Sequence, residues 1–138
     1  NDIYNSLPQD LKSVIITTQT VSGHGKEDTN NFTSSDKLYL LSTAEIWTQG
    51  TSNTIDYDAA RDKTRQLDYY KSKGVTTGDY AGAIKNNSSG TATSWWLRCA
   101  NSNTNTGFYA VSINGNWSGS ITTVARNTYG VSPTFRIG

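Results

Sequence analysis

The stretch SWWLRCANSNTNTGFYAVSING, residues 94–115, decides the fold that this sequence predicts. Two parts of it, 94–98 and 107–113, are rich in the aromatic and aliphatic residues that β-strands favour. The second part ends at Asn114-Gly115, a pair typical of a two-residue type I′ turn between antiparallel strands. We therefore expect a β-hairpin here, with residues 116–124 as the partner strand.

Trp95 and Trp96 are neighbours on the expected strand 94–98. Adjacent residues of a strand point to opposite faces of the sheet. We therefore expect one of the two indoles in the core, while the other reaches the surface or a second layer.

Further strand patterns cover residues 15–21, 37–41 and 131–137, and helix patterns lie between them. Helices mixed with early strands, followed by a run of strands, predict an α+β domain with a mainly antiparallel sheet. A chain of 138 residues fits one hydrophobic core. We therefore expect a single domain over residues 1–138.

Two short helices are marked by signals at their starts. Pro8 suits a first helical position in a short helix over 7–14, because the amide hydrogen that proline lacks would be unpaired there. Ser42 and Glu45 have the spacing of a capping box, in which each side chain pairs with a free backbone amide. A short helix is therefore expected directly after Ser42.

The longest helix pattern covers residues 58–73. Asp56 or Asp58 can cap its first turn, and the interior is made of good helix formers. Gly74 stands where a helix commonly ends in a left-handed residue. These signals predict one continuous helix.

The composition excludes several classes of function. Apolar residues make up 34% and charged residues 17%, and the balance is Asn, Ser, Thr and Gly, as in extracellular β-rich domains. The net charge is +1 without a basic cluster, so we expect no nucleic-acid partner. No apolar stretch reaches the roughly 18 residues that span a bilayer, so we expect no membrane insertion by this segment. Because the chain starts at Asn1 without Met, we expect a leader or anchor to have been removed and the domain to be secreted or displayed on a cell surface.

Catalytic candidates are few. His24 is the single histidine and lies in a polar loop without the neighbours that a metal site or a triad needs. Cys99, the single cysteine, follows an apolar strand, where a small buried thiol is the common case. We therefore expect no catalytic residue and no cofactor, and hence not an enzyme.

Asp56, Asp58 and Asp62 could supply oxygen ligands to calcium. Their spacing is not that of an EF-hand, and helix capping accounts for them more simply. We therefore expect no metal site.

The C-terminal part carries the expected binding surface. Tyrosine and tryptophan offer rigid contact area, serine and asparagine adapt their hydrogen bonds, and arginine is frequent at binding hot spots. The expected contact residues are Tyr109, Ser112, Asn114, Trp117, Ser118, Ser120, Thr122, Arg126 and Tyr129. The alternative is that these are ordinary surface residues, with Tyr109 or Trp117 packed on the sheet.

Several motifs in a fixed order carry a family resemblance. They are DKLYLLS at 36–42 with Glu45, RDKTRQLDYY at 61–70, WWLR at 95–98, GFYAV at 107–111, NG at 114–115, and GVSPTFRI at 130–137. This pattern resembles a family of bacterial surface domains with a C-type-lectin-like fold, and its C-terminal part is similar to the variable proteins of diversity-generating retroelements. One departure is Ser132, which stands where the first group usually carries arginine.

The resemblance implies a C-type-lectin-like fold, with two helices and a mixed, mostly antiparallel sheet. It also implies a displayed and possibly diversified C-terminal surface. The sugar-binding calcium motifs Glu-Pro-Asn and Trp-Asn-Asp are missing here. Calcium-dependent sugar binding is therefore not implied.

Taken together, these features predict a recognition module for a protein or glycan ligand. The first alternative is a structural head or tip domain of a surface appendage such as a pilus, whose C-terminal face packs on a neighbouring subunit. The second is a degenerate relative of an enzyme fold with a small-molecule pocket lined by convergent polar groups. The sequence shows no titratable cluster for such a pocket.

Overall fold

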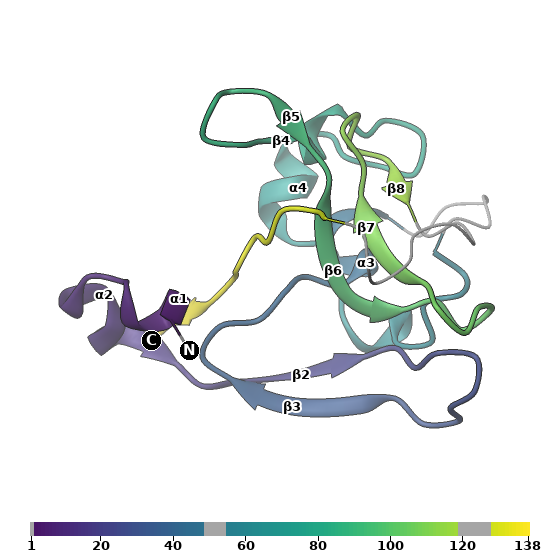
Figure 1. The fold of residues 1–138 in the computed structure, drawn as a ribbon, viewed down its shortest axis with the longest axis horizontal. Helices are drawn as coiled ribbons and strands as arrows, with labels where there is room; N and C mark the ends of the chain where they lie inside the picture. The colour runs from purple at the N-terminus through teal and green to yellow at the C-terminus, as the bar shows by residue number, and fades with distance from the viewer. Residues whose placement is uncertain (1, 49–54, 119–127) are drawn as a thin grey trace.

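The apolar segments 94–98 and 107–113 form the first two strands of a three-stranded sheet, which lies away from the two chain termini (Figure 1). In this computed structural model, which describes residues 2–48, 55–118 and 128–138, β6 (Trp95–Ala100) pairs with β7 (Phe108–Val111), and β7 pairs with β8 (Trp117–Ser118). Both pairings are antiparallel. The mixture of helices and small antiparallel sheets confirms the expected α+β class.

The hairpin between β7 and β8 forms as expected, but with a different turn. The Gly115 amide donates to the Ser112 carbonyl at 2.9 Å, and the Ser112 amide donates to the Asn116 carbonyl at 2.8 Å. Gly115 has φ +85°, whereas no described residue other than glycine has a positive φ. A type I′ turn needs a positive φ at both central residues, so this loop is instead a type I turn closed by a left-handed glycine.

The other edge of β6 is held by separate segments rather than by a long strand. The amides of Trp96, Arg98 and Ala100 donate to the carbonyls of Gly130, Leu41 and Gly23 at 3.0, 3.0 and 3.1 Å. The expected strand 37–41 is therefore wrong. Its residues make single contacts with different neighbours, including an antiparallel bridge between Tyr39 and Thr134, instead of a ladder with one partner.

The N-terminal part changes partner along its length. β1 (Ile15–Ile16) pairs with β9 (Arg136–Ile137), and β2 (Thr18–Ser22) pairs with β3 (Phe32–Asp36). The expected strand 15–21 is thus divided at Thr17, and the expected strand 131–137 is reduced to β9 and the bridge at Thr134. The pairing of β1 with β9 brings the two ends of the chain together, beside α1 (Asp2–Asn5) and α2 (Gln9–Val14) (Figure 1).

The expected long helix 58–73 is wrong. A 3-10 turn, η1 (Arg61–Lys63), and a short helix, α4 (Asp68–Ser72), are separated by extended backbone at Thr64 and Leu67. Tertiary hydrogen bonds explain the break. The Leu67 amide donates to the Glu45 carbonyl at 2.9 Å, and the Gln66 side chain donates to the Ile46 and Val75 carbonyls at 2.8 and 2.7 Å.

Other local signals are confirmed. The capping box starts α3 (Thr43–Ile46), where the Ser42 amide donates to the Glu45 carboxylate at 2.7 Å. Gly74 follows α4 with φ +71°. The region between Gly74 and β6 also contains η2 (Ala81–Ala83) and a small hairpin of β4 (Lys85–Asn86) and β5 (Ala92–Thr93).

The core lies on one face of β6 and β7. Trp95, Leu97 and Cys99 are at most 2% exposed, whereas Trp96 and Arg98 between them are only partly buried. This alternation confirms that the two neighbouring tryptophans point to opposite faces. The core side chains packed with Trp95 come from most of the chain and include Leu41, Ile46, Trp47, Ile55, Tyr70, Val75, Ala83, Tyr109 and Val111.

We predict that Gly115→Ala destabilises the domain far more than Gly90→Ala. Both glycines have a left-handed φ, +85° and +79°, so both substitutions carry the backbone strain of about 1–2 kcal/mol. A Cβ at Gly115 would also clash with the carbonyl oxygen of Tyr80, whereas at Gly90 it would meet nothing within 4 Å. Urea denaturation should show an extra loss of about 2 kcal/mol for Gly115→Ala. Equal losses for the two variants would contradict this account of the turn.

Candidate binding surface

The outer face of β6 carries an aromatic pair at its first end. Trp96 and Tyr129 are both partly exposed, and their rings stack with centroids 4.7 Å apart at an interplanar angle of 38°. The backbone fixes this contact, because Gly130 forms a parallel bridge to Trp95 and its amide donates to the Ser94 carbonyl at 2.8 Å. Tyr129 thus lies against the outer face of β6, and Trp96 is its partner.

The hairpin loop lies at the same end of the sheet. Trp95 pairs with Val111, so the loop that follows Val111 projects beyond the start of β6. At its tip, Ile113 is 61% exposed and Asn114 is exposed. The Ser112 hydroxyl contacts the side-chain oxygens of Asn114 and Asn116, which orders the polar side of the loop.

Two of the expected contact residues belong to the core instead. Tyr109 is 1% exposed, because it lies two residues before Val111 and so shares the inner face of β7. Trp117 pairs with Val111 and is only partly exposed, and its ring makes edge contacts with Trp47 at 6.4 Å and Tyr80 at 5.2 Å. Tyr109 is therefore not part of the candidate surface. Trp117 packs against the core rather than extending into solvent.

The remaining expected residues are placed only in part. Ser118 pairs with Ala110 at the end of β8. Ser120, Thr122 and Arg126 lie outside the described residues. The candidate surface therefore consists of Ser112, Ile113, Asn114, Trp96 and Tyr129.

Two residues of this surface, Trp96 and Ile113, were not among the expected contact residues. The Ile113 side chain is 61% exposed at the tip of the hairpin loop. Ile113 could have been identified from the position next to Asn114-Gly115, since a hairpin loop lies at the surface.

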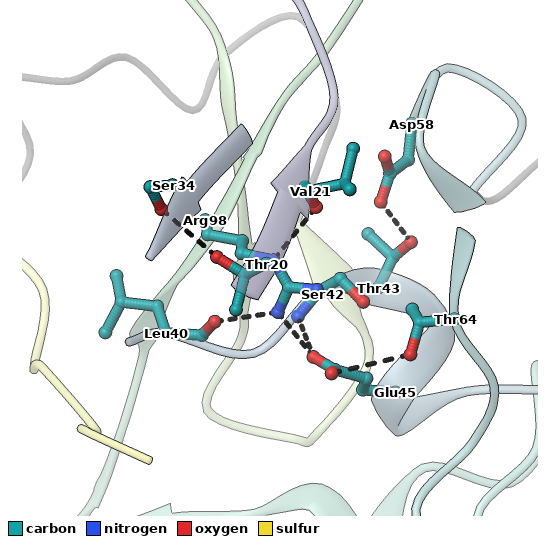
Figure 2. A network of polar contacts seen from close by, with 10 residues as sticks. All are labelled: Thr20, Val21, Ser34, Leu40, Ser42, Thr43, Glu45, Asp58, Thr64 and Arg98. Atoms are coloured by element: carbon teal, nitrogen blue, oxygen red, sulfur yellow. Dashed lines mark hydrogen bonds and ion pairs between the residues drawn. The ribbon is translucent and has the colours of Figure 1, made fainter. Parts of the chain in front are cut away.

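Further along the same face of β6, Arg98 joins several segments in one polar network (Figure 2). Its guanidinium donates to the Val21 carbonyl at 3.1 Å, to the Leu40 carbonyl at 2.9 Å and to the Glu45 carboxylate at 2.5 Å. The Arg98 and Glu45 side chains are 9% and 10% exposed. Glu45 also receives the hydrogen bond of the Ser42 amide, so each charge has both an opposite charge and backbone partners.

Asp58 is the second buried acidic group. It is fully buried and accepts hydrogen bonds from the Thr43 hydroxyl at 2.6 Å and from the Ala60 amide at 2.9 Å. Asp58 was expected to cap a helix. The amide that donates to it belongs to Ala60, the residue directly before η1. Burial, together with the nearby charge of Asp58, raises the pKa of the Cys99 thiol well above its usual range, so this buried cysteine stays protonated.

Within the described part of the chain, no three or more His, Cys, Asp or Glu side chains lie together in a way that could hold a metal ion. Asp62, which could have joined such a group, pairs with Lys63 at 3.0 Å on the surface. The hydrogen bond from Lys63 lowers the pKa of Asp62. His24 contacts the Gly25 carbonyl through Nδ1 at 2.7 Å.

No helix of the described residues combines the length and apolar character needed to cross a membrane.

Comparison with known families gives one match. The family model of the domain of unknown function DUF6273 matches residues 1–138, so the chain belongs to that family. No curated protein and no solved structure matches the chain.

We predict that Arg98→Met lowers the free energy of unfolding by about 3–5 kcal/mol, because it leaves the Glu45 carboxylate buried without a cation. The carbonyls of Val21 and Leu40 would also lose their donor. Urea denaturation measures the loss, and the exposed Lys71→Met, as a control, should stay within about 0.5 kcal/mol of the wild type. A loss below about 1 kcal/mol would show that the Arg98 network does not stabilise the fold.

Proposed function

We propose that this member of the DUF6273 family is a recognition module that binds a protein or glycan partner and is not an enzyme. The observation that supports this most directly is the convergence of exposed residues at one end of the β6–β7–β8 sheet. The stacked pair of Trp96 and Tyr129 lies there beside the hairpin loop with Ser112 and Asn114.

The chemistry of this surface suits binding. Stacked aromatic rings lose little conformational entropy when a partner covers them, and they offer both apolar faces and polar edges. Ser112 and Asn114 supply hydroxyl and amide groups that can match varied partners. The exposed Ile113 adds apolar contact area next to them.

The finer fold assignment belongs to the same proposal. The α+β mixture, the antiparallel pairing and the loop-rich C-terminal half are compatible with a C-type-lectin-like domain. In such a domain the partner would lie on another cell or surface, and the protein would be secreted or displayed.

Diversification of the C-terminal surface is a separate part of the proposal, and it predicts a pattern in the DNA. A reverse-transcriptase gene should lie near the coding region, together with a near-copy of the segment that encodes residues 95–138. The two copies should differ at adenines, and the differences should fall on codons such as that of Asn114 rather than on those of Trp95 or Val111, because the latter two residues fill the core. Sequencing the locus decides this, and a locus without such a repeat would exclude diversification.

Replacement of both Asn114 and Tyr129 by alanine should weaken partner binding by about 2 kcal/mol or more, roughly thirtyfold in affinity, since polar and aromatic contacts of this kind dominate interfaces. Partners are first found by applying the labelled domain to an array of glycans and of extracellular matrix proteins. Dissociation constants of each hit are then measured for wild type and variant.

The matched control is the double variant Tyr69→Ala and Asn5→Ala, which removes the same residue types from exposed positions on α4 and α1. It should keep wild-type affinity within about 0.5 kcal/mol. Equal affinity of the Asn114/Tyr129 variant and the wild type would remove this surface from the binding site. Sedimentation of the wild type at rising concentration distinguishes the alternative of an appendage subunit, which would self-associate through this face.

A further inference from the structure

A polar cleft lies between β2 and the extended segment that joins η1 to α4. It is lined by residues 18–21, by residues 62–68, and by Tyr39, Glu45, Arg98 and Arg136, and it has a volume of about 600 Å³. Cavities of this size hold small organic ligands. No described residue of the candidate binding surface lines it.

The charges that line the cleft leave a positive balance. Glu45 is neutralised by Arg98 at 2.5 Å, and Asp62 is neutralised by Lys63 at 3.0 Å. Arg65 and Arg136 are exposed and form no ion pair within the described part of the chain. Against them stands Asp68 as the remaining carboxylate of the lining.

The wall of the cleft also holds an unsatisfied hydroxyl. Thr18 is 7% exposed, and its Oγ1 is buried without a hydrogen-bond partner among the described residues. Thr20, on the same face of β2, pairs its hydroxyl with that of Ser34 at 3.2 Å. Buried polar atoms are nearly always hydrogen-bonded, and a ligand hydroxyl that reaches Thr18 would supply the bond that its side chain lacks.

Tyr39 offers a second hydroxyl at the rim. It is partly exposed, and burial raises its pKa, so the phenol stays protonated and able to donate. The cleft thus combines two hydroxyl groups with two guanidinium groups that form no ion pair among the described residues. Guanidinium groups bind carboxylates in a two-pronged fashion, and hydroxyl groups bind the hydroxyls of sugars.

We propose that this cleft binds a small, hydroxyl-bearing carboxylate of the size of one sugar acid. Arg65 and Arg136 receive the carboxylate, and Thr18 and Tyr39 contact the hydroxyl groups. The Arg98–Glu45 pair lines the cleft and links its two walls, because Arg98 donates to the Val21 carbonyl and the Glu45 carbonyl accepts from the Leu67 amide. This site is separate from the proposed macromolecular surface, and its failure would leave that surface untouched.

The test is an NMR titration of the domain with glucuronate, with glucose as the uncharged counterpart. Glucuronate should bind saturably with a dissociation constant on the order of 1 mM, and glucose at least about tenfold more weakly. Backbone signals of Thr18, Thr20 and Thr64 should move with one common dissociation constant, because all three line the cleft.

Two variants locate the binding. The double variant Arg65→Gln and Arg136→Gln should weaken glucuronate binding at least about tenfold, whereas Lys26→Gln with Lys71→Gln, which removes the same charge from exposed positions outside the cleft, should not change it. Thr18→Val keeps the shape of the side chain and removes only the unpaired hydroxyl. It should weaken binding severalfold while the thermal midpoint stays equal or rises.

Several results would each overturn the proposal. They are an absence of saturable binding of glucuronate up to about 50 mM, equal affinity for glucose, or unchanged affinity in the Arg65/Arg136 variant. Unchanged affinity in Thr18→Val would likewise overturn it, because the unpaired hydroxyl would then have no part in the site.

Discussion

Arg98 and Glu45 form a nearly buried ion pair on which the arrangement of the surrounding segments depends. The described strands are short, so their ladders alone connect few parts of the chain. The guanidinium of Arg98 instead binds the Val21 carbonyl, which is 77 residues away, the Leu40 carbonyl, 58 residues away, and Glu45, 53 residues away. Removing two charges from water is costly, and a buried pair persists only where further hydrogen bonds satisfy both ions. The backbone partners of Arg98 and the Ser42 amide on Glu45 meet that condition.

The same pair also explains why the outer face of β6 is divided. Trp96 and Arg98 share this face, but the chain that passes through Leu40 and Leu41 binds at Arg98, whereas Gly130 binds at Trp96. Tyr129 can therefore stack on Trp96, while the polar cleft opens beside Arg98. The two proposed contact regions are therefore held by different segments. Gly130 binds the backbone of β6 at Trp96, and Leu41 binds it at Arg98.

The sequence predicted what local physics determines. The alternation of Trp95 and Trp96, the capping box of Ser42 and the left-handed Gly74 each depend on a few neighbouring residues. The prediction of a helix over 58–73 was wrong because Leu67 and Gln66 donate hydrogen bonds to the distant carbonyls of Glu45 and Ile46. Helix propensity is a local property and does not include such tertiary bonds. Of the expected contact residues, Tyr109 could have been assigned to the core from its spacing to Val111. The Arg98 network and the cleft were not predictable, since they join residues from five separate segments.

The distribution of stabilising contacts bears on what the exposed residues are free to do. Tyr109 and Trp117 contribute their rings to the core, so a change at either one would disturb packing and not merely a surface. The Ser112 hydroxyl contacts the side chains of Asn114 and Asn116 within the loop, while the shape of that loop is set by Gly115 and by backbone hydrogen bonds. Side chains at the loop tip can therefore differ without loss of the backbone that presents them. A scaffold whose stability comes from an inner row of aromatic residues and from one buried ion pair meets the physical requirement for displaying variable contacts.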